Sequence, residues 1–367
     1  MSKPQFDVGF TVNRQGRPAL DCQFSLPRVL GTTATITADA AISSFIAHSF
    51  NLKYLLPNVF AGWNFSAEAL KQVNDFQYAC SFSESVTGVS LGWTRAGHRI
   101  GLDAHLRDVH PLVSLVGTKL TASEQIRRVP LRAIKTSVNY NYMSDKIVRK
   151  SPSSPHPVGG HKLTLNADIS GLFGDVRMSK LESSFQAHRQ IATDIVLHSR
   201  VGTGAIAQLN SNRDQTPIQD RFFLGGTTEE YSMLRGFGYR SVGPAGKRVV
   251  MPGATIKKGE KLYDHLGGDA YISIDNVVSF PLYVKDDGLD IRGMAFAQMG
   301  SLIPSLNSRA AYDLAKNVRA SIGVGVVVPI GALGTMEVTL GRPVFGATST
   351  DTTQSLQIGV RIGYKAN

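Results

Sequence analysis

The chain has 367 residues, of which 42% are hydrophobic, only 18% are charged and 36 are glycine. A helical membrane protein is excluded, because a spanning helix needs about 20 nearly uninterrupted apolar residues and the most apolar stretch, 322–333, is broken by glycines and a proline. Cys22 and Cys80 form neither a CxxC pair nor a cluster with histidine, so no disulfide framework or zinc site is indicated. The net charge of +11 is spread along the chain, which disfavours nucleic-acid binding and fits a basic lumen or contact with anionic lipid headgroups.

The amino-terminal half alternates apolar and polar residues with the period of a β-strand. In a membrane barrel one parity faces lipid and is apolar, while the other faces the lumen and can be polar. Residues 6–13 follow this rule, with Phe6, Val8 and Phe10 on the apolar face and Gly9 on the other. The pattern predicts further strands at 20–26, 34–40, 49–56, 59–67, 75–83, 88–93, 100–105, 133–143, 161–169, 178–190 and 193–209.

Two segments interrupt the pattern and are not predicted to be strands. Residues 151–160 are rich in proline, serine and histidine, as in a solvated loop. Residues 210–266 are far longer than an ordinary connection, and loops of that length are usually functional or disordered.

The alternation is clearest in the carboxyl-terminal third, at 270–280, 291–300, 318–328 and 335–340. The closing strand, 356–364, places Leu356, Ile358 and Val360 on the apolar face and Gly359 and Gly363 on the other. We therefore predict an all-β fold: a transmembrane antiparallel β-barrel of about 16 strands that forms a single domain over residues 1–367.

The long segment 210–266 contains a distinctive motif. The sequence Arg-Phe-Phe-Leu-Gly-Gly at 221–226 is followed by Leu-Arg-Gly-Phe at 234–237. This pair resembles the signature loop of the outer-membrane assembly superfamily typified by bacterial BamA, and further matches at 241–244, 266–271, 279–282 and 296–302 look most like its mitochondrial branch, the core barrel of the sorting and assembly machinery. The resemblance implies that the loop folds into the lumen and is held there by a latch formed by Leu234, Arg235, Gly236 and Phe237.

A guanidinium in a confined lumen needs a planar charged or polar acceptor. Asp269, on the predicted lumen parity, is the first candidate partner of Arg235, and Gln298 and Phe296 are the next. Bacterial relatives carry aspartate where this chain has Gln298. For Arg235 the alternative is a solvated loop arginine, and for Asp269 a lumen residue with no special partner. The spacer 227–233 is longer than usual, and with a first strand near Phe6 no amino-terminal POTRA module is expected.

The resemblance also implies a function, the insertion and assembly of β-barrel precursors in the mitochondrial outer membrane. A precursor strand would pair by β-augmentation with a lateral gate between the first and last strands. Glycines at this seam lack side chains for cross-strand packing, which weakens it. The implied partners are unfolded precursors, peripheral subunits of the sorting and assembly machinery and membrane lipids, without nucleic acid, cofactor or metal. The candidate gate residues are Phe6, Val8, Gly9, Phe10, Leu356, Ile358, Gly359, Val360 and Gly363.

Several alternatives stay open at this point. A passive porin-like channel is also a basic barrel, although it has no need of the 221–237 motif, and a plastid outer-envelope relative would share the superfamily. A soluble β-sandwich is disfavoured by the number of strands with one apolar parity. A dinucleotide site at the Gly-Val-Gly of 323–325 is disfavoured because no helix follows, and the scattered histidines suggest no nucleophile and base, so enzymatic activity is not expected.

Overall fold

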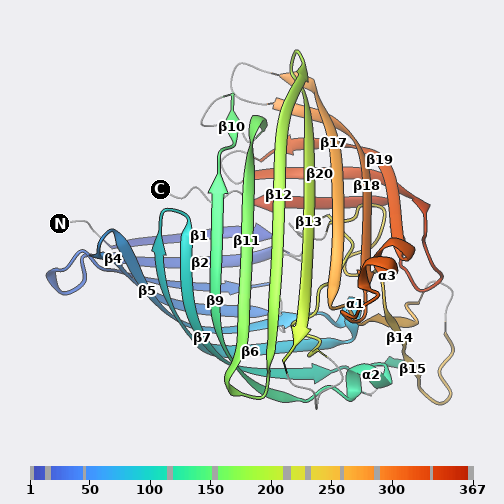
Figure 1. The fold of residues 1–367 in the computed structure, drawn as a ribbon, viewed down its shortest axis with the longest axis horizontal. Helices are drawn as coiled ribbons and strands as arrows, with labels where there is room; N and C mark the ends of the chain where they lie inside the picture. The colour runs from blue at the N-terminus through green and yellow to red at the C-terminus, as the bar shows by residue number, and fades with distance from the viewer. Residues whose placement is uncertain are drawn as a thin grey trace.

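The computed structural model describes residues 4–12, 18–43, 47–113, 119–150, 156–209, 216–227, 233–256, 260–284, 290–330 and 334–362. In these ranges a single sheet of 17 strands dominates the fold; one of them, β10, has two residues, and the other 16 pair antiparallel with their neighbours in chain order. The sheet curls around a lumen (Figure 1). The long strands are β1 (Gln5–Val12), β2 (Pro18–Pro27), β3 (Thr35–Ile42), β4 (His48–Phe60), β5 (Trp63–Asp75), β6 (Phe82–Arg95), β7 (His98–Pro111), β9 (Arg132–Asp145), β11 (Pro157–Gly174), β12 (Met178–Ala192), β13 (Ile195–Gln208), β17 (Ala270–Val284), β18 (Asp290–Ile303), β19 (Val318–Pro329), β20 (Gly334–Phe345) and β21 (Leu356–Ile362).

The remaining elements are short and belong to the connections. None of the helices in the described ranges is long and apolar enough to cross a membrane. The short elements are β8 (Leu120–Thr121), β10 (Val148–Arg149), β14 (Ala245–Lys247), β15 (Val249–Val250), β16 (Tyr263–His265), α1 (Gln77–Cys80), α2 (Glu124–Arg127), α3 (Ala310–Lys316) and the 3₁₀ turn Val29–Gly31.

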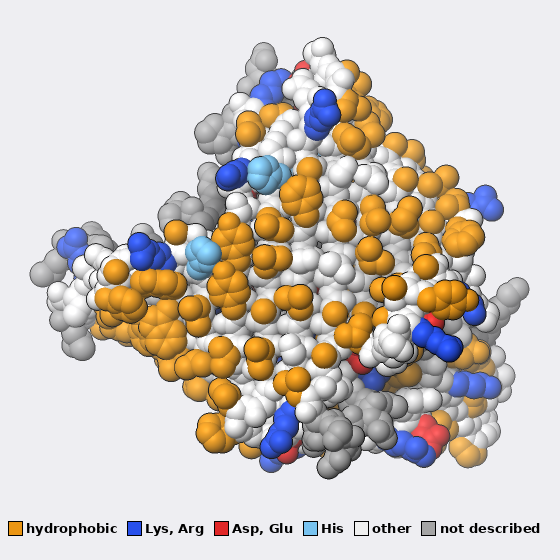
Figure 2. All heavy atoms as spheres, viewed as in Figure 1, with side chains coloured by type: hydrophobic (Ala, Val, Ile, Leu, Met, Phe, Trp, Pro, Cys, Tyr) orange, Lys and Arg blue, Asp and Glu red, His pale blue; other side chains and the backbone are white. Residues whose placement is uncertain are grey.

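The two faces of the sheet differ as the alternation predicts. On β12, Phe185 is exposed on the outer surface, whereas its neighbours Ser184 and Gln186 are buried on the lumen side. Apolar side chains cover the outer wall in Figure 2. On β21, Leu356 and Ile358 point outward while Gln357 is buried. The predicted fold, a membrane barrel of about 16 strands, is confirmed.

Some strand boundaries in the amino-terminal half were wrong. The predicted strand 59–67 runs across a tight hairpin turn between β4 and β5, in which Ala61 and Gly62 both have positive φ, 49° and 80°. Such turns usually carry Asn or Asp before the glycine, so Ala61 gave no signal. The predicted strand 75–83 contains α1, between the end of β5 and the start of β6. Segment 210–266, predicted to be free of strands, holds the short β14, β15 and β16, and β11 begins inside the predicted loop 151–160.

The two ends of the sheet meet without pairing. Cα atoms of β1 and β21 approach within 8 Å of one another. β1 pairs with β2, and β21 pairs with β20. Over the described parts of both strands, however, no ladder joins β1 to β21. Among the residues that the structure describes, each strand therefore has one edge without a ladder partner, and we call this junction the seam.

The assignment of faces can be tested with a charge on the lipid side. Phe185→Arg should destabilise the protein folded in liposomes, reducing the free energy of unfolding by about 2–4 kcal/mol, because an arginine on the lipid face must cross or distort the hydrocarbon layer. Asn166→Arg, in which the new side chain enters the polar lumen, is the control and should cost less. Urea titration of the folded fraction measures both; equal losses would contradict the assignment.

Candidate functional site: a lumen loop held at two ends

The segment between β13 and β17 lies inside the curve of the sheet (Figure 1). Its apolar side chains Phe222, Leu224, Leu234, Phe237 and Val242 are buried against wall residues in one cluster. Burial of this apolar surface stabilises the loop within the lumen. The loop is therefore packed as part of the protein interior.

Arg235 forms the centre of this packing. Its guanidinium is fully buried and binds two wall carboxylates: Nε and Nη2 donate to Glu337 of β20 at 2.5 and 3.1 Å, and Nη1 donates to Asp275 of β17 at 3.4 Å. Burial alone would lower the pKa of Arg235, but the two carboxylates outweigh it and raise the pKa. A desolvated charge is tolerable only when it is paired and hydrogen-bonded in this way.

Two of the candidate partners contact Arg235 by other means. The Arg235 backbone N–H donates to the Gln298 Oε1 atom at 2.6 Å. The ring of Phe296 lies 5.2 Å from the guanidinium carbon, within the range of a cation–π contact. Gln298 thus holds the backbone of the loop, while the charge is balanced elsewhere on the wall.

Asp269, the first candidate, does not bind Arg235, and that prediction was wrong. Its carboxyl group accepts a hydrogen bond from Thr216 and lies near Arg221. Side-chain parity identifies the face of a strand but not the height along it, and the six residues from Asp269 to Asp275 span about 20 Å. Asp275 and Glu337 both lie on the predicted lumen parity. Only the fold shows that these two carboxylates lie at the same depth in the lumen as Arg235.

The latch also holds the last strand of the barrel. The Gly236 N–H donates to Gln357 Oε1 at 2.8 Å, and Gln357 Nε2 donates to the Phe237 carbonyl at 2.7 Å. Gly236 has a φ of 82°, and a Cβ there would contact the backbone of Gly341 at 3.4 Å. Glycine is therefore suited to this position by both its conformation and the close approach of β20. The alternation placed Gln357 on the lumen face but indicated no role for it.

Gly359 has a different environment from the one expected. A Cβ at this position would lie 2.8 Å from the Thr227 hydroxyl of the loop. The missing side chain makes room for the loop on the lumen side, so Gly359 contributes to the contact between loop and β21.

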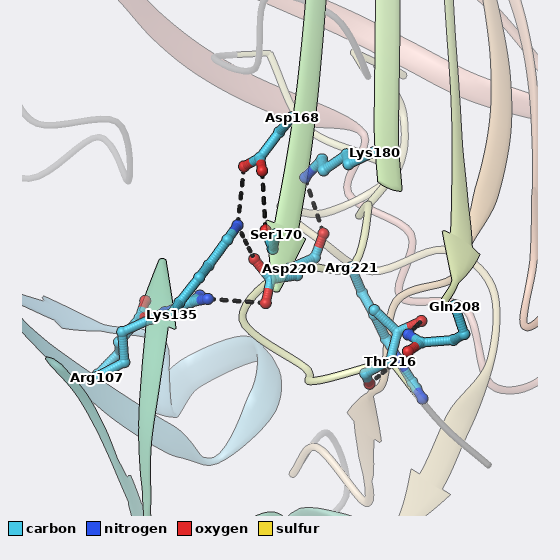
Figure 3. A network of polar contacts seen from close by, with 10 residues as sticks. Arg107, Lys135, Asp168, Ser170, Lys180, Gln208, Thr216, Asp220 and Arg221 are labelled. Atoms are coloured by element: carbon cyan, nitrogen blue, oxygen red, sulfur yellow. Dashed lines mark hydrogen bonds and ion pairs between the residues drawn. The ribbon is translucent and has the colours of Figure 1, made fainter. Parts of the chain in front are cut away.

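A second polar cluster holds the beginning of the loop to the opposite wall (Figure 3). The buried Asp220 carboxylate accepts from Arg107 Nη1 of β7 at 2.8 Å and from Lys135 Nζ of β9 at 2.9 Å. Lys180 of β12 donates to the Asp220 carbonyl at 2.8 Å. Glu84 pairs with Arg107, and Asp168 with Lys135. We call these residues the Asp220 cluster; no pattern in the sequence indicated it.

The charges in the Asp220 cluster compensate one another. Arg107, Lys135 and Lys180 face Asp220, Glu84 and Asp168, three cations against three carboxylates. Burial alone would raise the pKa of Asp220, but Arg107 and Lys135 lower it to about 2. Asp220 is therefore ionised at neutral pH and binds the loop to two strands at once.

A polar cavity of about 400 Å³ lies beside this cluster. Its lining is hydrophilic and carries both signs of charge, from Lys135, Lys180, Asp168 and Glu182 among others. In the part of the chain that the structure describes, no group of three or more His, Cys, Asp or Glu residues could hold a metal ion.

The candidate gate residues lie at the seam to the extent that they are described. Phe6, Val8, Leu356 and Ile358 are more than half exposed on the outer surface. The strands β1 and β21 contain Gly9, Phe10 and Val360, whose ladder partners are Asp21, Leu20 and Met336. Gly363 lies outside the described residues.

The chain is similar to proteins of one superfamily. The Omp85 superfamily domain matches residues 29–364. The chain is 25% identical to a sorting and assembly machinery component 50 homologue of Bos taurus, covering 89% of this chain and 65% of that protein. It is 26% identical to the corresponding homologue of Xenopus tropicalis, covering 96% of this chain and 71% of that protein. The chain thus spans about two thirds of the length of these relatives.

A solved structure shares the fold. The crystal structure of BamA from Haemophilus ducreyi lacking POTRA domains 1-3 matches with a TM-score of 0.72 at 15% identity, covering 97% of this chain and 69% of that chain. The resemblance inferred from the motifs at 221–226 and 234–237 is confirmed by these comparisons.

The Arg235 site makes a prediction about stability. Arg235→Ala should lower the free energy of unfolding by about 3–5 kcal/mol, because it leaves two buried carboxylates without their cation. Arg235→Lys should recover only part of the loss, since an ammonium cannot reproduce the bidentate contact with Glu337. Urea unfolding in detergent measures this. Lys150→Ala, which removes an exposed pair with Asp194, should leave the midpoint unchanged, and an equal loss in that control would refute the assignment.

The Asp220 cluster predicts a pH dependence. The folded pKa of Asp220, about 2, lies below its unfolded value near 4. The stabilisation is therefore present above pH 4 and is lost as the pH falls towards 2, by on the order of 2 kcal/mol. The difference in unfolding midpoint between the natural chain and Asp220→Asn should be large at pH 5 and shrink at pH 2.5. A difference that is constant with pH would contradict the assignment.

Proposed function

Because the chain belongs to the Omp85 superfamily, we propose that it inserts β-barrel precursor proteins into the mitochondrial outer membrane through a lateral gate between β1 and β21. The observation that carries this proposal is the seam, at which the described parts of two strands approach one another without a ladder. An incoming strand could pair with either free edge.

The physical reason for a gate at this place lies in the bilayer. Backbone N–H and C=O groups without partners are costly in hydrocarbon. A precursor strand that enters the membrane alone carries many such groups, whereas β-augmentation at the seam would satisfy one edge of it before it meets lipid. The apolar side chains of Phe6, Val8, Leu356 and Ile358 would keep the outer face of the seam compatible with lipid.

The packed loop supports an assembly factor over a passive porin. An open pore needs an unobstructed lumen, but here the cluster around Phe222, Leu234 and Phe237 fills part of it. At one mouth the buried apolar side chains of Ile218 and Phe223 pack with Ala79 of α1, Ile126 of α2 and Phe82 at the start of β6. The loop is held in the lumen by buried ion pairs at Asp220 and Arg235, so it obstructs the free diffusion of metabolites.

The mitochondrial assignment and the partners follow the relatives. The homologues from Bos taurus and Xenopus tropicalis are named as components of a sorting and assembly machinery. We extend this to unfolded β-barrel precursors as substrates and to peripheral subunits of that machinery as partners. Subcellular fractionation separates this assignment from a plastid outer envelope.

A disulfide across the seam tests the gate. Val8→Cys and Ile358→Cys should be combined with Cys22→Ser, because Cys22 is the direct ladder partner of Val8. The crosslinked protein should fail to assemble newly imported porin, and reduction should restore assembly. Phe6→Cys can replace Val8→Cys to sample a second register.

The matched control crosslinks a pair that already lies in a ladder. Val338 and Ile358 are direct partners on β20 and β21, so a disulfide between them should leave assembly intact. If the seam disulfide forms and assembly proceeds normally, the gate is refuted. After depletion, normal porin assembly with altered metabolite conductance would favour the passive channel.

A further inference from the structure

We propose that the lumen loop is a strut that sets the separation of β1 and β21, and that Asp220 is the positioning residue at the end of the strut remote from the seam. The meaning of this separation for precursor entry rests on the proposed function. The strut itself concerns only the distance between β1 and β21, which can be measured without a precursor.

One end of the strut is the Asp220 cluster. Its cations come from β7, β9 and β12, which are the seventh, eighth and tenth long strands of the sheet. These strands lie about halfway around a wall of 16. Three independent donors converge on one residue, as the stick view in Figure 3 shows. The beginning of the loop is therefore fixed to the wall farthest from the seam along the sheet.

The other end of the strut is the latch, which binds β17, β18, β20 and β21 through Asp275, Gln298, Glu337 and Gln357. Of these strands, β21 is one side of the seam. The backbone beyond the latch continues this contact, because Gln354 N–H donates to the Gly236 carbonyl at 3.0 Å and Gly238 N–H donates to the Thr352 carbonyl at 2.8 Å. The last strand and the residues before it are thus bound directly to the loop.

The two ends are joined through described backbone contacts. Gly226 and Leu234 exchange hydrogen bonds of 3.2 and 3.1 Å, and Gly226 N–H also lies 3.1 Å from the Phe237 carbonyl. Leu224 bridges to Val242. Side chains on both sides of these bridges belong to one buried apolar cluster, so the loop can transmit a displacement from one end to the other.

This arrangement decides where the free edge of β21 lies. A sheet that pairs only with its neighbours in order can change its curvature by small adjustments at every ladder, and these add up at the unpaired ends. A strut between the middle strands and the last strand removes that freedom, because it connects them by a short path across the lumen. Loss of the Asp220 carboxylate should therefore move a seam that lies on the far side of the barrel.

Dipolar broadening of continuous-wave electron paramagnetic resonance spectra measures the effect, because it responds to spin labels as close together as those on neighbouring strands. Spin labels at Val8→Cys and Ile358→Cys, with Cys22→Ser and the fully buried Cys80 retained, report the seam in the purified full chain. A second pair at Val338→Cys and Ile358→Cys reports a distance within the wall. In Asp220→Asn the distribution of seam distances should broaden, and its mean should lengthen by about 5 Å, the spacing of one strand. The distance within the wall should stay unchanged.

Two further variants complete the test. Asp108 lies on β7, the strand of Arg107, but its carboxylate pairs with Arg132 and not with the loop. Asp108→Asn should therefore leave both distances unchanged. Gln357→Leu releases the opposite end of the strut and should lengthen the seam distance as Asp220→Asn does; it also serves if Asp220→Asn does not fold.

The outcomes separate a strut from a general loosening of the barrel and from the proposed function. An unchanged seam in folded Asp220→Asn overturns the proposal, and so does an equal broadening of both distances, which would indicate general loosening. If the seam moves but the protein has no activity in porin assembly, the strut stands and the proposed function fails. If porin assembly requires the chain but the seam distance is unchanged in both Asp220→Asn and Gln357→Leu, the proposed function stands and the strut fails.

Discussion

The buried guanidinium of Arg235 is the interaction on which the interior of this barrel depends. A charge removed from water is stable only beside opposite charge, so the loop can enter the lumen only where the wall supplies carboxylates. Glu337 and Asp275 provide them from two different strands. Once Arg235 is bound, Leu234 and Phe237 are placed in the apolar cluster and Gly236 against β20, and the position of the loop is determined.

The same requirement appears near the beginning of the loop with the signs reversed. Asp220 enters the lumen as a buried anion and finds Arg107 and Lys135. The two ends are complementary: the loop brings a cation to an acidic part of the wall and an anion to a basic part. Opposite pairing at two distant places gives the loop a single orientation, since exchange of the ends would place like charges together.

The bilayer imposes the second constraint, which concerns the backbone. Every strand within hydrocarbon needs partners on both edges, and in this sheet the condition is met by ladders everywhere among the described strands except between β1 and β21. The contacts of Gln357 and Gly359 with the loop show that the last strand is held from the lumen side.

The sequence by itself determined the class of fold, the faces of the strands and the identity of the loop. Alternation with period two is a local property, and it assigned Ile358 to lipid and Gln357 to the lumen correctly. It failed locally where the backbone departs from common turn chemistry, as at Ala61, whose positive φ no neighbouring residue signals. The 221–226 and 234–237 motifs identified the loop because residue types in a fixed order can be compared directly.

Only the tertiary structure decided which residues meet. Asp269 and Asp275 are equivalent by parity, yet only Asp275 pairs with Arg235, because the depth at which the loop lies in the lumen is set by its packing against the wall. Glu337 and Asp220 are separated by 102 and 113 residues from Arg235 and Arg107, respectively, and no local pattern links residues so far apart. The charges were visible in the sequence, but their pairing required the curvature that brings opposite walls to one loop.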